Sequence, residues 1–202
     1  MSEEHRWKPD EYIASWEHSA GVISQFFPIL VEHGNLKAGQ KVLDLGCASG
    51  KWAIAFAMFG CDTVAIDYMP EMLDRVRLNF PVLHRALWII EDDARTLNTM
   101  PDHMLDMIES EGLYEHFLDI KERKKMVINW FWKLNHTGVC VIMVPQNNDA
   151  DDEVKFETQE DLVKELQTFN VFKRIFATTF TRKNGDEGVG IIMAICHKDK
   201  PQ

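Results

Sequence analysis

Residues 42–50 (VLDLGCASG) constrain the fold more strongly than any other part of the chain. A short apolar run leads into an acid and a glycine-rich turn, and residues 52–59 follow without a helix breaker. This order predicts a buried strand, a tight loop and a helix whose free N–H groups face the loop. Glycine lets a ligand approach the backbone closely, and a helix N-terminus attracts negative groups. The segment is therefore a candidate binding loop for a small ligand.

The rest of the chain alternates between strand and helix patterns. Strands are expected at 41–45, 63–67, 87–90, 105–109, 139–144, 171–178 and 190–197, and helices at 51–59, 70–79, 118–134 and 158–169. Continuous apolar strands separated by helices favour a mainly parallel sheet covered on both faces. Only residues 180–189 separate the last two strands, and Asn184 and Gly185 within them are a hairpin signal. The last strand is therefore expected to run antiparallel.

Residues 10–33 carry apolar side chains at helical spacing. Pro28 is expected to interrupt this helix and to begin a second short one, which Gly34 would end. The segment either packs on the flank of the domain or forms a lid, with Tyr12 and Trp16 near the mouth of the site. Two further tryptophans, Trp88 and Trp130, are expected in the core.

Length and composition narrow the class of protein. With 202 residues and 46% hydrophobic content, the chain is expected to be one domain, with a helical cover at 1–36 and a core at 37–202. A net charge of −10 disfavours nucleic acid as a partner. Four widely separated cysteines predict a disulfide-free, cytoplasmic protein. No apolar run approaches membrane-spanning length, residues 1–10 do not resemble a signal peptide, and we predict neither a membrane segment nor a metal site.

Two familiar phosphate-binding loops do not match the glycine-rich segment. A Walker loop needs four residues between its glycines and a Ser or Thr after its lysine, but three residues separate Gly46 from Gly50, and Trp52 follows the lysine. Ala48 stands where a dinucleotide-binding loop has its second glycine. Asp44 would also repel a pyrophosphate, whereas it would attract a cationic ligand.

Four segments, 42–50, 64–67, 93–95 and 111–117, resemble those of class I S-adenosylmethionine-dependent methyltransferases. The resemblance runs from about Leu36 to Cys196. It implies an α/β, three-layer Rossmann-like methyltransferase fold, with a mainly parallel seven-stranded sheet and an antiparallel last strand. It also implies S-adenosyl-L-methionine as cofactor, with S-adenosyl-L-homocysteine as product. The acid at the end of the second strand, about 20 residues after the loop, makes the resemblance specific.

The resemblance assigns the first part of the cofactor site to the loop. Asp44 would face the methionine end of the cofactor, directly or through water, and Glu111 would line the same side. The loop residues that would lie against the cofactor are Gly46, Cys47, Ala48 and Gly50. Ala48 replaces the usual middle glycine, which should leave binding intact.

The nucleoside end would be bound after the next two strands. By the same resemblance Asp67 would accept hydrogen bonds from both ribose hydroxyls, and Tyr68 would pack on the adenine. Asp93 would accept from the adenine amino group while the Ala94 N–H meets a ring nitrogen, with Asp92 competing for the role of Asp93. Other interpretations remain open: Asp67 could simply cap a helix, and residues 91–93 could form a solvated loop.

Catalysis and substrate are less constrained by the sequence. His116, just after the fourth strand, is the candidate general base, although it could instead cap or pack on the following helix. The motifs of DNA amino and cytosine C5 methylation are absent after the fourth strand. We therefore expect a small-molecule methyl acceptor. The acid-rich segment 144–153 either selects a cationic acceptor or is a solvated loop. The alternatives are a related enzyme such as an aminopropyl transferase, and a non-catalytic binding module.

Overall fold

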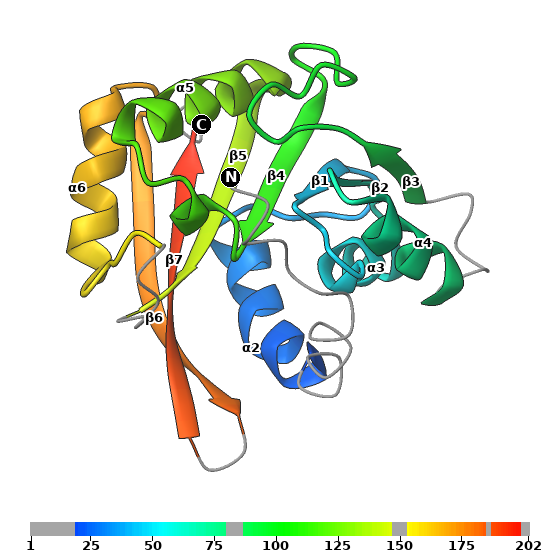
Figure 1. Ribbon diagram of the computed structural model, residues 1–202, viewed down its shortest axis with the longest axis horizontal. Coiled ribbons are helices and arrows are strands. Elements are labelled where there is room, and N and C mark those ends of the chain that lie inside the picture. Colours follow the sequence, from blue (N-terminus) through cyan, green and yellow to red (C-terminus); the bar gives the residue numbers. More distant parts are fainter. Residues whose placement is uncertain (1–18, 80–86, 147–152, 185–186, 199–202) are drawn as a thin grey trace.

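The computed structural model contains a seven-stranded sheet with helices on both faces (Figure 1). The described residues are 19–79, 87–146, 153–184 and 187–198. Tyr12 and Trp16, which we expected near the mouth of the site, lie outside them, as does Gly185. No described helix is both long and apolar enough to cross a membrane.

The sheet has the strand order β3-β2-β1-β4-β5-β7-β6. Its strands are β1 (Lys41–Leu45), β2 (Asp62–Asp67), β3 (Leu87–Glu91), β4 (Leu105–Glu111), β5 (Leu134–Pro145), β6 (Arg174–Asn184) and β7 (Glu187–His197). Each pair of neighbouring strands within the set β1 to β5 is parallel. Strand β7 is antiparallel to both of its neighbours, β5 and β6. The predicted α/β fold with an antiparallel last strand is confirmed. The strand order reverses between β1 and β4, and open sheets of this kind bind ligands at such a point.

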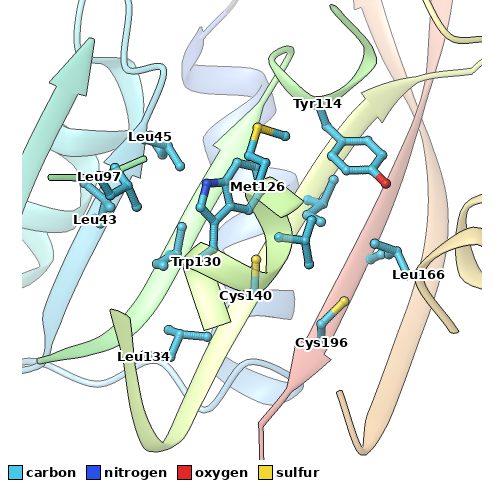
Figure 2. Packing of buried hydrophobic residues seen from close by; sticks show 14 of the residues in the cluster. Leu43, Leu45, Leu97, Tyr114, Met126, Trp130, Leu134, Cys140, Leu166 and Cys196 are labelled. Carbon is cyan, nitrogen blue, oxygen red and sulfur yellow. The ribbon is translucent and has the colours of Figure 1, made fainter. Parts of the chain in front are cut away.

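Helices cover both faces of the sheet and make three layers. The helical segments are α2 (Ser19–Glu32), α3 (Lys51–Phe59), α4 (Pro70–Asn79), the 3₁₀ turn η2 (Tyr114–His116), α5 (Ile120–Lys133) and α6 (Gln159–Phe169). On one face Phe26 of α2 and Trp52 of α3 pack with Val42, and α4 joins them through Leu73. On the other face α5 and α6 bury the apolar side chains shown in Figure 2.

The two tryptophans expected in the core have different environments. Trp130 of α5 is fully buried among the side chains of Figure 2, and its indole N–H donates to the Ala94 carbonyl at 2.7 Å. The prediction for Trp130 is confirmed. Trp88 is 63% exposed, so the prediction for Trp88 is wrong. It lies on β3, the edge strand, while the helices on its face pack over β5, β6 and β7.

Pro28 lies inside α2, and the helix continues to Glu32. The expectation that Pro28 would interrupt the helix and begin a second one is therefore wrong. A proline removes one N–H from the helix, but Phe26 and Leu30 on either side are fully buried against the sheet. Burial of this apolar face stabilises the helix through the proline.

The hairpin at the end of the chain is longer than expected. The ladder between β6 and β7 continues to the pair of Asn184 with Glu187, so only residues 185 and 186 separate the strands. The expected connection over 180–189 is wrong in length, because the antiparallel ladder extends up to the turn. β5 also begins at Leu134, directly after α5, rather than at Val139.

Candidate functional site

The glycine-rich loop after β1 is fixed to the end of β2. The N–H groups of Gly46 and Cys47 both donate to the Ile66 carbonyl at 2.9 Å. Gly46 and Gly50 have φ angles of 74° and 87°, which favour glycine. A Cβ atom on Gly50 would lie 2.8 Å from a methyl group of Val76 in α4. The loop therefore needs glycine at Gly50 for two separate reasons, backbone conformation and helix packing.

Asp67, at the end of β2, links this loop to the start of α4. Its carboxylate accepts from the Ala48 N–H and from the Met69 N–H, each at 2.9 Å. Burial raises the pKa of Asp67, while these backbone hydrogen bonds lower it. Met69 precedes α4, which begins at Pro70, so this contact fixes the entry to the helix and does not cap its first turn. A carboxylate has about four acceptor positions, so Asp67 retains capacity for a ligand.

Asp44 and Glu111 lie at the ends of β1 and β4, beside the start of α3. The buried Asp44 carboxylate accepts from the Ala53 N–H at 2.7 Å. Burial raises the pKa of Asp44 to about 7, although this hydrogen bond and the charge of Lys51 oppose the shift. Glu111 accepts from the Trp52 indole N–H at 2.7 Å and pairs with the Lys51 ammonium. The first turn of α3 thus orients both acids.

Glu109 is part of the same acidic group, although sequence reasoning did not include it in the site. It is paired with Asp44 in the register of β4 and β1, and its side chain is fully buried. The sequence signal for it is an acid at the end of the apolar strand expected at 105–109. An acid in that position is unusual, because buried carboxyls need a partner.

The carboxylates of the two acids after β3, Asp92 and Asp93, accept hydrogen bonds from residues of their own loop. Asp92 accepts from the Thr99 N–H and hydroxyl at 2.8 and 2.6 Å, and Asp93 pairs with the Arg95 guanidinium through both oxygens. Hydrogen bonds from Thr99 and from Arg95 hold the pKa values of Asp92 and Asp93, respectively, below their usual range. Adenine recognition by Asp93 stays a prediction, and it requires Asp93 to share its oxygens with Arg95. Tyr68 is 44% exposed.

His116 lies in η2, which three contacts fix to more distant parts of the chain. Its Nδ1 atom is 3.2 Å from a carboxylate oxygen of Glu153, within the segment 144–153. The Tyr114 hydroxyl donates to Glu165 of α6, and the Glu115 carbonyl accepts from the Val154 N–H. Residues 147–152 of the expected substrate segment lie outside the described residues. The cap of α5 is Asp119, so His116 is not required for that purpose.

Sequence comparisons find similarity between this chain and known methyltransferases. Residues 42–138 match the family model described as a methyltransferase domain. The chain is also 36% identical over 101 residues to phosphoethanolamine N-methyltransferase 1 of Zea mays, covering 50% of this chain and 20% of that protein. It is 31% identical over 74 residues to an uncharacterized methyltransferase of Synechocystis, covering 37% of this chain and 35% of that protein. Over these stretches the chain is similar to S-adenosylmethionine-dependent methyltransferases.

Solved structures of methyltransferases share its fold. A SAM-dependent methyltransferase from Aquifex aeolicus has a TM-score of 0.67 at 15% identity, and the match covers 96% of this chain and 100% of that one. Magnesium protoporphyrin IX methyltransferase from Synechocystis, crystallised with bound SAH, has a TM-score of 0.65 at 18% identity, covering 91% and 84%. The matches to the curated relatives span only about a fifth and a third of those proteins.

The site fits S-adenosylmethionine, the cofactor of methyltransferases that this chain resembles. That molecule carries an ammonium, a sulfonium and a ribose diol, and carboxylates suit the first and the last of these groups. Asp44 and Glu111 stand on one side of the loop and Asp67 on the other. Gly46 has no side chain to obstruct a ligand, and a Cβ there would lie 3.1 Å from Leu113. Among the described residues no cluster of three His, Cys, Asp or Glu side chains could hold a metal ion.

Glu115 adds a buried carboxyl near the candidate site. It is 2% exposed, and one of its oxygens has no hydrogen-bond partner among the described residues. Burial, reinforced by the charges of Glu153 and Glu111, raises the pKa of Glu115 to about 8. In the unfolded chain this group ionises near 4.5. The neutral carboxyl therefore contributes its full stability to the folded protein below that pH, and this contribution should be lost as the pH rises toward 8.

Glu115→Gln should therefore become more stable relative to the parent chain as the pH rises. Glutamine does not ionise, so between pH 5 and pH 8 the difference in free energy of unfolding should shift by about 3 kcal/mol in favour of the variant. Urea unfolding at both pH values measures it. Glu160→Gln is the control, because Glu160 is exposed and hydrogen bonds lower its pKa. An identical difference at pH 5 and pH 8 for Glu115→Gln would contradict the assignment.

Proposed function

We propose that the protein transfers the methyl group of S-adenosylmethionine to a small-molecule acceptor. The observation that carries this proposal is the group of acids around the glycine-rich loop at the switch point, where Asp44, Asp67 and Glu111 are held by backbone or indole N–H groups. Such an arrangement suits a cationic nucleoside and does not suit a pyrophosphate. The sequence match to a methyltransferase domain supports the same activity.

The residues of the chain would position the reactants and manage a proton. S-adenosylmethionine, when bound, supplies an electrophilic methyl group on a sulfonium. Methyl transfer is an in-line displacement, so the protein mainly aligns the acceptor and excludes water. His116, held through Nδ1 by Glu153, would accept a proton from the acceptor at Nε2. Glu153 is then a positioning residue, because it acts through the imidazole.

A small-molecule acceptor is supported by three observations. The net charge of −10 disfavours nucleic acid, and the names of two similar proteins refer to phosphoethanolamine and to magnesium protoporphyrin IX, both small molecules. The Glu153 carboxylate beside His116 favours a neutral or cationic acceptor over an anionic one. We also propose a cytoplasmic location, which the free thiols of all four cysteines support.

Methyl transfer from donor with an isotopically labelled methyl group tests this proposal. The protein is incubated with labelled S-adenosylmethionine and a metabolite extract, and label is followed into small molecules and into protein. We expect label in a small-molecule product. Label only in protein would overturn the acceptor class, and cofactor binding without any transfer would favour a non-catalytic module. Turnover of decarboxylated S-adenosylmethionine in place of the parent donor would favour an aminopropyl transferase.

A further inference from the structure

Glu115, in the turn η2, has a buried carboxyl that the fold satisfies on one side only. Glu115 is 2% exposed, and its Oε2 atom has no hydrogen-bond partner among the described residues. The hydrogen bond that this carboxyl accepts comes from its own backbone N–H. Buried polar atoms are nearly always paired, because an unpaired one costs free energy. A ligand that brings a donor to Oε2 would remove this cost.

The surroundings of Glu115 place its carboxyl between the base candidate and the cofactor loop. The charges of Glu153 and Glu111 both act on it. Glu153 contacts Nδ1 of His116 at 3.2 Å, whereas Glu111 is bound by the first turn of α3, which directly follows the glycine-rich loop. The reacting atom of an acceptor has to reach both the methyl donor and the base. Glu115 therefore lies where that atom has to be bound.

We propose that the methyl acceptor is a primary or secondary amine, and that the Glu115 carboxyl binds its reacting nitrogen. Such an amine, bound as its ammonium, brings two or three N–H donors and a positive charge. It therefore keeps at least one donor for Glu115 after it has given a proton to His116. An alcohol or a thiol has a single such hydrogen, which the base removes. This inference rests on the proposed function, since it assumes methyl transfer from S-adenosylmethionine with His116 as the base.

Each proton and electron pair of the transfer has a destination. His116 accepts one proton from the bound ammonium at Nε2. The lone pair that this frees on nitrogen forms the bond to the methyl group, while the bond from that methyl group to sulfur breaks and leaves its electron pair on sulfur. The methylated product is again an ammonium, which Glu115 continues to bind. His116 then releases its proton to solvent.

The protonation state of Glu115 agrees with a cationic ligand. Burial, reinforced by the charges of Glu153 and Glu111, raises the pKa of Glu115 to about 8, so the unliganded protein keeps this carboxyl neutral near pH 7. A bound ammonium favours the carboxylate, and the proton leaves to solvent. The same positive charge offsets the repulsion among the three acids, which a neutral acceptor does not do.

The test uses a metabolite extract in which the amines of one half have been blocked. That half is treated with an acetylating N-hydroxysuccinimide ester, which converts primary and secondary amines to amides, and then with hydroxylamine, which removes acetyl groups from oxygen and sulfur. Each half is incubated with the protein and S-adenosylmethionine that carries a labelled methyl group. We expect a labelled small-molecule product from the untreated half and its loss from the blocked half.

Glu115→Gln tests whether Glu115 is the residue that binds the amine. The variant removes the charge but keeps the size of the side chain, so transfer to the untreated extract should fall at least about 10-fold. Affinity for S-adenosylhomocysteine should change less than about 3-fold. Glu160→Gln, an exposed acid on α6, is the control and should change neither. If Glu115→Gln does not fold, Glu115→Asp, which shortens the side chain, should show the same decrease in transfer.

The outcomes separate this inference from the proposed function. If no small molecule is labelled in either half, the proposed function fails. Equal labelling of the two halves overturns the amine acceptor but leaves methyl transfer to a small molecule intact. If only the untreated half is labelled, but the Glu115 variant transfers as fast as the parent protein, the role of Glu115 is overturned. The same holds if the variant loses affinity for S-adenosylhomocysteine together with transfer.

Discussion

Asp67→Ala lowers the affinity for S-adenosylhomocysteine by at least about 30-fold, which corresponds to roughly 2 kcal/mol. In the proposed complex the carboxylate of Asp67 accepts from both ribose hydroxyls, and hydrogen bonds to a charged group are among the stronger ones. The substitution also removes the acceptor for the Ala48 and Met69 N–H groups. The loop itself should therefore loosen, which adds to the loss.

Titration calorimetry with a parallel melting curve checks this prediction. The matched control is Asp74→Ala on α4, because Asp74 is an exposed acid paired only with Arg77 among the contacts described for it. It should bind S-adenosylhomocysteine as the parent protein does. A variant Asp67→Ala that melts lower but retains full affinity would mean that Asp67 serves only as a helix cap and loop anchor.

His116→Ala should slow methyl transfer by about 100-fold or more without weakening cofactor binding. General-base catalysis typically contributes a factor of this size, and among the contacts described for η2 none joins His116 to the glycine-rich loop. The measurement is single-turnover methyl transfer, with S-adenosylhomocysteine affinity measured on the same protein. Turnover equal to that of the parent would remove His116 from the mechanism.

A second substitution tests how Glu153 acts on His116. Glu153→Gln keeps a hydrogen-bond acceptor near Nδ1 but removes the charge. We expect a smaller decrease in turnover, about 10-fold, and a change in the pH profile of kcat. The double variant should be no slower than His116→Ala alone, because a positioning residue has no effect once its target is gone. Additive losses would indicate a separate role for Glu153.

Much of the fold followed from local patterns in the sequence. The apolar run before Gly46 predicted β1, and the helix after Gly50 begins where the breaker-free segment begins. These features are local, because side-chain period and glycine conformations act within a few residues. The Asn184 hairpin signal likewise predicted the antiparallel last strand correctly.

Features that depend on tertiary neighbours could not be predicted in this way. Trp88 is exposed because β3 is an edge strand, and edge position follows from the order of the whole sheet. Pro28 stays inside a helix because the surrounding residues are buried on the sheet. Glu109 is found to belong to the acidic group only when β4 is aligned with β1, which places it beside Asp44.

The site shows the same division between local and distant effects. The acids after each strand could be found from the sequence, since parallel strands present their carboxyl ends at one edge of the sheet. The groups that form hydrogen bonds with these acids in the folded protein could not be found in the same way. Asp67, for example, accepts a hydrogen bond from the N–H of Ala48, which lies 19 positions earlier in the chain. Which oxygens remain available to a ligand depends on these contacts.

A crystal structure of the protein with S-adenosylhomocysteine tests the central claim most directly. We predict the ribose hydroxyls within hydrogen-bond distance of Asp67, the adenine between Tyr68 and Ala94, and the homocysteine end near Asp44 and Glu111. Such a structure would also decide between Asp92 and Asp93 as the partner of the adenine amino group. Density for the ligand away from the loop of residues 46–50, or no binding at millimolar ligand, would contradict the account.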